Sequence, residues 1–244
     1  MKTIISSLAF AAYLLPISSL WASSLTVAGD ANIFGAGHAS APGPGGGGAG
    51  QLPPVFSFAA GPAQILTFSQ VTGSVRIDFD DTPGFSNGPD GGTLYTRTDI
   101  SSFGGLSGII DNAKTMFLVG AFLSGGEPTD PAPARLDFSS SALTEGFLAL
   151  APQLNQVFFI GDGLTGTGSG SVQQFSVPAG ATRLFLGFAD SYNGGSNTIS
   201  GSPGFYADND GSVTATFKIV PEPSSALLLI GGVAGIAFFR RKAA

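Results

Sequence analysis

The stretch Leu184-Phe185-Leu186-Gly187-Phe188 is a short run without a polar side chain, which is typical of a central β-strand covered on both faces. A second stretch, Val213-Thr214-Ala215-Thr216-Phe217, alternates between apolar and polar side chains, as a strand with one wet face does. Both stretches predict a sheet protein. The predicted strands cover residues 64–68, 73–79, 115–123, 156–160, 172–177, 182–188 and 212–219.

The composition agrees with many short strands joined by tight turns. The 244 residues include 37 Gly, 16 Pro and 21 Phe, and good helix formers are few. The fold class is therefore all-β, as a sandwich or a barrel. Because there is no Cys, disulfides cannot stabilise the domain, which must depend on core burial, to which a bound metal could add.

Charge excludes one class of partner. The formal net charge is −6, with 10 Lys and Arg against 16 Asp and Glu. Such a chain repels phosphate backbones, so we expect no nucleic acid partner and instead neutral ligands or cations.

The C-terminus carries three signals in a fixed order. Pro221-Glu222-Pro223 is rigid and extended, Ala226 to Phe239 is apolar, and Arg240-Arg241-Lys242 is basic. As a helix the apolar stretch would rise only about 21 Å, against about 30 Å of hydrocarbon, so it predicts a marginal span. In this order and spacing the segment resembles the PEP-CTERM sorting signal of bacterial envelope proteins. An ordinary tail anchor is the alternative.

That resemblance implies a route and a partner. Such proteins are handled by exosortase, a membrane peptidase, so Glu222 and its prolines would be recognised rather than catalytic. The chain would be anchored transiently in the bacterial inner membrane and then reside in the envelope or outside the cell. Its setting would be a biofilm or an exopolysaccharide matrix.

The N-terminus also predicts export. Lys2 precedes the apolar run Ile4 to Leu15, and Ala22 is a small residue at the expected cleavage point. The predicted organisation is a signal peptide over residues 1–22, a Gly/Pro-rich flexible segment over 23–52, a β-sandwich over 53–219 and the sorting signal over 220–244.

Oxygen-bearing side chains gather near the end of the predicted sandwich. Asp190 follows one strand, and Asp208-Asn209-Asp210-Gly211 precedes the last one. A hairpin would bring these hard donors together, and Ca²⁺ takes six to eight such oxygens in flexible geometry. The alternative is that Asp208-Asn209-Asp210-Gly211 is only a turn.

Residues 172–217 resemble the calcium-dependent galactose-binding lectins of bacteria, which are small jelly-roll-like β-sandwiches. The resemblance lies in a strand, an Asp, a loop, a Pro-Gly pair, an aromatic residue, two adjacent polar residues, Gly-Ser and a final strand. It implies sugar contacts by Asp190 and Asp208. The implied calcium ligands are Asp190, the carbonyls of Phe205 and Ile77, and the side chains of Asp208 and Asn209.

The chain departs from that family in two respects, and two other functions stay open. The loop over residues 191–201 is longer than in the lectins, and the sole His, His38, lies far from it. One alternative is a structural surface or matrix protein that binds calcium but no sugar. The other is a polysaccharide hydrolase, for which Asp78, Asp80 and Asp81 form the densest acid cluster. We expect no enzyme activity, because one His cannot readily orient a serine and no thiol exists.

Overall fold

The computed structural model describes residues 22–76, 86–93, 97–139, 143–191 and 199–222. These residues form β-strands with only two short 3₁₀ helices, which confirms the all-β prediction. The elements in chain order are β1 (Ser23–Ala28), η1 (Ile33–Gly35), β2 (Val55–Ser57), β3 (Gln64–Arg76), β4 (Ser86–Asn87), β5 (Thr98–Ile100), β6 (Ile109–Asp111), β7 (Val119–Leu123), β8 (Leu136–Asp137), β9 (Ala149–Leu150), β10 (Val157–Phe159), β11 (Leu164–Gly166), β12 (Ser169–Val172), β13 (Gln174–Ser176), β14 (Arg183–Gly187), β15 (Ile199–Gly201), η2 (Tyr206–Asp208) and β16 (Asp210–Pro221).

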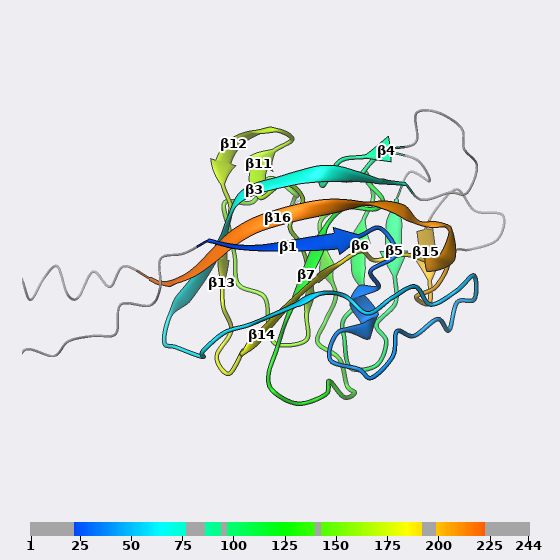
Figure 1. Cartoon of the computed structure of the whole chain (residues 1–244), viewed down its shortest axis with the longest axis horizontal. Helices are drawn as coiled ribbons and strands as arrows, with labels where there is room; N and C mark the ends of the chain where they lie inside the picture. Colours follow the sequence, from blue (N-terminus) through cyan, green and yellow to red (C-terminus); the bar gives the residue numbers. More distant parts are fainter. Residues whose placement is uncertain (1–21, 77–85, 94–96, 140–142, 192–198, 223–244) are drawn as a thin grey trace, which may run out of the picture.

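Two sheets carry most of the structure. The larger has the order β1-β16-β3-β13-β9, with β4 also paired to β3, and the smaller has the order β10-β7-β14-β2. Figure 1 shows β1, β16 and β3 as long ribbons that run side by side across the molecule. Two further small sheets, β15-β5-β6-β8 and the hairpin β11-β12, complete the described part.

The two stretches that predict the fold behave as expected. β14 lies between β7 and β2, and Leu184, Phe185 and Leu186 are buried, as a central apolar strand requires. Along β16, Val213, Ala215 and Phe217 are buried while the threonines between them face outward. The period of two therefore selects the face that packs on the core.

Phenylalanine rings join the two large sheets. Phe217 of β16 meets Phe56 of β2 edge to face, with ring centroids 5.2 Å apart. Phe175 of β13 packs against Phe158 of β10 at the same separation, 5.2 Å. Such ring pairs add to the large apolar area that each buried Phe removes from water. The described residues thus form a sandwich-like core, and the jelly-roll strand order stays a prediction.

One pair of predicted strands is a single long strand. Residues 64–68 and part of 73–79 belong to β3, which continues through Gly73 at φ +120°. At Gly73 a Cβ would lie 2.3 Å from the carbonyl oxygen of Ser212, so glycine lets β3 and β16 stay paired there. Residues 77–79 lie outside the described residues.

Residues 23–52, predicted to be a flexible segment, differ most from the expectation. Residues 23–28 form β1, and residues 43–50, here called the glycine strap, dock on residues 202–207. The strap is held by backbone hydrogen bonds, including Gly45 N to Pro203 O and Phe205 N to Gly46 O, both 2.8 Å. Six of the eight strap residues are glycine, and because glycine has no side chain, the two backbones can approach closely enough to bond.

The described ranges contain two helices, both short 3₁₀ turns. None of the helices there is long and apolar enough to cross a bilayer. The predicted signal peptide and the apolar stretch Ala226 to Phe239 lie outside those ranges.

Candidate functional site

The candidate site lies where β14 ends and β16 begins. Asp190 follows β14 and is only 2% exposed. Asp208 closes η2, and Asn209 links η2 to β16. The structure thus brings Asp190, Asp208 and Asn209 together at one rim of the sandwich, although eighteen or more positions of sequence separate the first from the others.

Asp190 organises this rim through hydrogen bonds. Its Oδ2 accepts from Asn209 Nδ2 at 2.8 Å, and its Oδ1 accepts from the backbone N–H of Ser191 at 2.7 Å. Its own backbone N–H donates to the Tyr206 hydroxyl at 3.0 Å, and that hydroxyl donates to the Phe188 carbonyl at 3.0 Å. Tyr206 is completely buried. The aspartate therefore stays in one orientation on a rigid base.

Electrostatics at Asp190 oppose an ionised carboxyl. Burial raises the pKa of Asp190 well above its usual range, and the negative charge of Asp208 adds to that increase. The hydrogen bonds from Asn209 and Ser191 act in the opposite direction but do not offset the burial. A cation between the two carboxylates would remove both the desolvation cost and the mutual repulsion.

The residues at the rim fit a hard cation such as Ca²⁺. Asp190 and Asp208 supply carboxylates, and Asn209 supplies an amide oxygen, which are the donors that calcium prefers. Asn209 is 9% exposed, and its Oδ1 is buried and meets no hydrogen-bond donor among the residues that the structure describes. An orphaned buried oxygen of this kind costs free energy unless something binds it.

Acidic side chains alone would not make this site. Within the described ranges no group of three or more His, Asp or Glu residues is placed to hold a metal. Any further ligands that the described residues supply would therefore include amide or carbonyl oxygens. The predicted carbonyl ligand Ile77 lies outside the described residues, as do Asp78, Asp80 and Asp81 of the alternative hydrolase cluster.

Phe205, predicted to give a carbonyl, has an unusual backbone. It adopts the left-handed conformation with φ +65°, directly before η2. Gly47 of the strap lies against it, since a Cβ at Gly47 would be 2.4 Å from Cδ1 of the Phe205 ring. A non-glycine residue at positive φ is uncommon, and such residues cluster at functional sites.

Asp210 is directed away from the rim site. It forms an ion pair with Arg76, with Nη2 and Oδ2 2.9 Å apart. The hydrogen bond from Arg76 lowers the pKa of Asp210 below its usual range. Of the four residues Asp208-Asn209-Asp210-Gly211, only the first two thus face Asp190.

Sequence reasoning missed Tyr206 and the glycine strap. A tyrosine between Phe205 and Ala207 could have signalled a buried hydroxyl with partners, because buried Tyr usually finds them. His38, expected in a flexible segment, is instead held between Glu127 and Gly104. Its Nδ1 lies 2.7 Å from Glu127 Oε1 and its Nε2 lies 3.0 Å from the Gly104 carbonyl.

The sorting signal begins inside the sheet. β16 continues to Pro221, which pairs with Gln64 of β3, and the Glu222 N–H donates to the Ala63 carbonyl at 2.5 Å. Pro223 and the cations Arg240, Arg241 and Lys242 lie outside the described residues. The structure therefore places the first two residues of the Pro-Glu-Pro tripeptide at the end of the folded domain.

Comparison with known proteins identifies this terminus. No curated protein and no solved structure matches the chain. Residues 220–242 match the PEP-CTERM protein-sorting motif, which supports the predicted sorting signal and its implied processing by exosortase. The chain thus carries a PEP-CTERM sorting motif at its C-terminus, which supports export and a membrane-anchoring sorting signal.

Proposed function

We propose that this exported protein is a cell-envelope or matrix component whose sandwich binds Ca²⁺ at the rim formed by Asp190, Asp208 and Asn209. One observation carries the proposal. Two carboxylates and an amide converge at a rigid rim, and the buried Oδ1 of Asn209 meets no donor among the described residues. Calcium bound there would join the end of β14 to the start of β16, in a domain that has no disulfide.

A second candidate is calcium-dependent binding of a galactose-type sugar or an extracellular polysaccharide. It rests on the resemblance of residues 172–217 to bacterial lectins and on the partial exposure of Asp208. Since Asp190 is 2% exposed, a sugar would meet the cation and Asp208 first. Single monosaccharide sites of millimolar affinity, about −4 kcal/mol, need many copies to hold a polymer. If galactose shifts no NMR resonance of the calcium-loaded protein, the matrix role without sugar is the better account.

Calcium should stabilise the protein against heat. At a hundredfold excess over Kd a ligand adds about 2.7 kcal/mol to the free energy of unfolding, which raises the Tm of a domain of this size by about 5–10 °C. We expect Asp190→Asn and Asp208→Asn to abolish most of that increment in a calorimetric calcium titration. Asp210→Asn is the matched control, because Asp210 lies beside the site but pairs with Arg76. An unchanged Tm in the wild type would contradict the proposal.

The pH provides a second readout of the same prediction. The folded-state pKa of Asp190 lies above its unfolded value of 3.8. In calcium-free protein, the contribution of Asp190 to the free energy of unfolding is therefore fully present below pH 3.8. That contribution is lost as the pH rises through the folded pKa. Calcium binding needs the ionised form, so the calcium increment in Tm should grow over the same pH range. Asp190→Asn should weaken the pH dependence of both quantities, the stability of the calcium-free protein and the calcium increment in Tm.

Glu222→Ala tests the sorting signal. If exosortase reads the Pro-Glu-Pro tripeptide, the variant should keep its membrane segment and stay in the inner-membrane fraction, while wild-type protein is released. Mass spectrometry of membrane and medium fractions measures both species. Lys218→Ala, a change at an exposed position of β16, is the control and should be released normally. Equal release of the Glu222 variant and the wild type would show that the tripeptide is only a spacer.

A further inference from the structure

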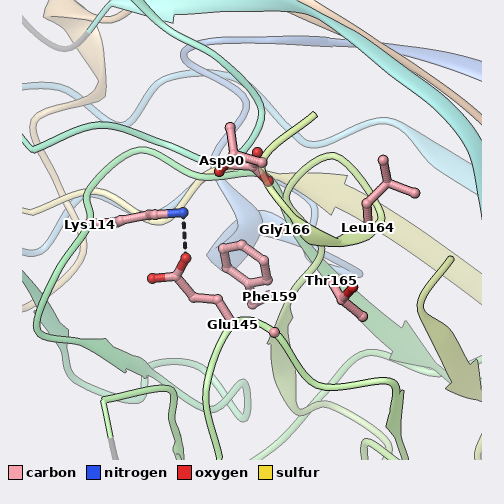
Figure 2. Close-up of a pocket in the computed structure, with 9 residues that line it drawn as sticks. Asp90, Lys114, Glu145, Phe159, Leu164, Thr165 and Gly166 are labelled. Atoms are coloured by element: carbon pink, nitrogen blue, oxygen red, sulfur yellow. Dashed lines mark ion pairs between the residues drawn. The ribbon is translucent and has the colours of Figure 1, made fainter. Parts of the chain in front are cut away.

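A second polar cluster lies far from the rim site along the chain. Lys114, after β6, contacts Glu145, which precedes β9, through Nζ and Oε2. Both residues line a cavity of about 100 Å³, and Figure 2 shows the Phe159 ring beside the pair. The Lys114 Nζ is 5.9 Å from the centroid of that ring. The two charged side chains are only 23% and 22% exposed, so the pair is largely shielded from water.

Asp111, the last residue of β6, lies against the same pair. It is 1% exposed, and its Oδ1 accepts from the N–H groups of Ala113 and Lys114 at 2.8 and 3.1 Å. Its Oδ2 is buried and meets no N–H or O–H donor among the described residues. Burial, with smaller contributions from the charge of Glu145 and a hydrogen bond to it, raises the pKa of Asp111 to about 6. Because both groups are carboxyls, a hydrogen bond between them forms only when one of them carries a proton.

The backbones that bear these side chains are fixed. Gln173 is completely buried, and its Nε2 donates to the carbonyls of Glu145 and Phe147 at 2.7 and 3.0 Å. On the other side, Thr98 Oγ1 donates to the Lys114 carbonyl at 2.8 Å. An amine and a carboxyl group are thus held in contact, next to a protonatable acid, which is the arrangement that favours an intramolecular reaction.

We propose that Lys114 and Glu145 condense to an isopeptide bond, with Asp111 as the acid–base group. The ammonium of Lys114 gives a proton to the Glu145 carboxylate that it contacts, and the neutral Nζ then attacks Cδ of the protonated Glu145. Asp111 protonates the departing hydroxyl, which leaves as water when the C–O bond breaks. The second Nζ proton passes to the Asp111 carboxylate, which thereby regains the proton that it gave to the hydroxyl, and the third Nζ proton stays as the amide N–H. An ammonium and a carboxylate give one amide and one water, and nothing is oxidised or reduced.

The bond would have a structural use that is independent of calcium. It would join the segment after β6 to the segment before β9, two regions that short strands and loops otherwise hold. A covalent cross-link of this kind lowers the conformational entropy of the unfolded chain, as a disulfide does. The protein has no Cys with which to form a disulfide.

Peptide mass spectrometry of full-length chain tests the proposal directly. Trypsin cuts after Arg97, Lys114, Arg135 and Arg183 in this region. With the bond in place, Lys114 is not cut, and residues 98–135 stay joined to residues 136–183. This species should weigh one water less than the two peptides together. Recovery of separate peptides 98–114 and 136–183 at full mass would show an ion pair only and overturn the proposal.

Three variants separate the roles of the residues. Lys114→Arg keeps the positive charge but should give no linked species and a lower Tm than the wild type. Asp111→Asn keeps Lys114 and Glu145 but should form the bond at least about a hundredfold more slowly, as loss of a general acid–base group does. Glu127→Gln changes an acid outside the cluster and should leave the linked fraction unchanged. Normal linking in Asp111→Asn would overturn the role of Asp111.

Discussion

Phe175→Ala should lower the free energy of unfolding by about 3–5 kcal/mol, which is the usual cost of removing a fully buried ring. Phe175 is 0% exposed, and its ring contacts three others. The centroid distances are 5.2 Å to Phe158, 5.7 Å to Phe147 and 5.9 Å to Phe68. Phe158 belongs to the opposite sheet, so the truncation opens a cavity between the two layers, which neighbouring side chains cannot easily fill.

Urea denaturation of the wild type and the variant measures this loss. Leu148→Ala is the control, because Leu148 is a large apolar residue that is 59% exposed. Its truncation should change the free energy of unfolding by no more than about 0.5 kcal/mol. A loss below about 1 kcal/mol for Phe175→Ala would show that the rings do not form a close-packed junction between the sheets.

Gly50→Ala should have the second largest effect. Gly50 has φ +66°, a conformation that costs a residue with a Cβ about 1–2 kcal/mol. Its Cβ would also lie 2.2 Å from the Asp30 carbonyl oxygen and 2.6 Å from Tyr206 Cβ. Overpacking of this kind adds about 1–3 kcal/mol. Because Tyr206 supports Asp190, the variant should also lose part of the calcium-dependent rise in Tm.

Gly88→Ala is the matched substitution for this experiment. A Cβ at Gly88 would have no heavy atom within 4 Å, and Gly88 does not have a positive φ. The variant should therefore be as stable as the wild type or slightly more stable. Equal stability of both glycine variants would mean that the glycine strap does not rest on the rim.

Sequence patterns predict a strand where its side chains show which of its faces are buried. The apolar run of β14 and the alternation in β16 identify two strands because their side chains record which faces are buried. The convergence of Asp190 with Asp208 and Asn209 was predicted from their positions at strand ends, but the hairpin expected to bring them together is wrong, because β14 and β16 belong to different sheets. Whether calcium binds there stays a prediction.

The glycine strap could not be predicted in the same way. A glycine run has no side-chain pattern, so a flexible linker and a docked segment look alike in sequence. Its contacts with Pro203 and Phe205 are made by backbone groups. The cluster of Asp111, Lys114 and Glu145 was missed for another reason. Its members come from loops that no periodic pattern places, and only the packed structure brings them together.

The direction of β16 places the sorting signal and the rim at opposite ends of the large sheet. Pro221 and Ser23 lie towards one end of the large sheet, and Asp210, next to the rim, lies at the other (Figure 1). The 12 residues of β16 span about 40 Å at the rise of an extended strand. Only residues 223–225 separate the domain from the apolar stretch, a tether of about 10 Å. A chain anchored through that stretch would stand with Pro221 towards the bilayer, and the rim at the opposite end of β16 would face away from it.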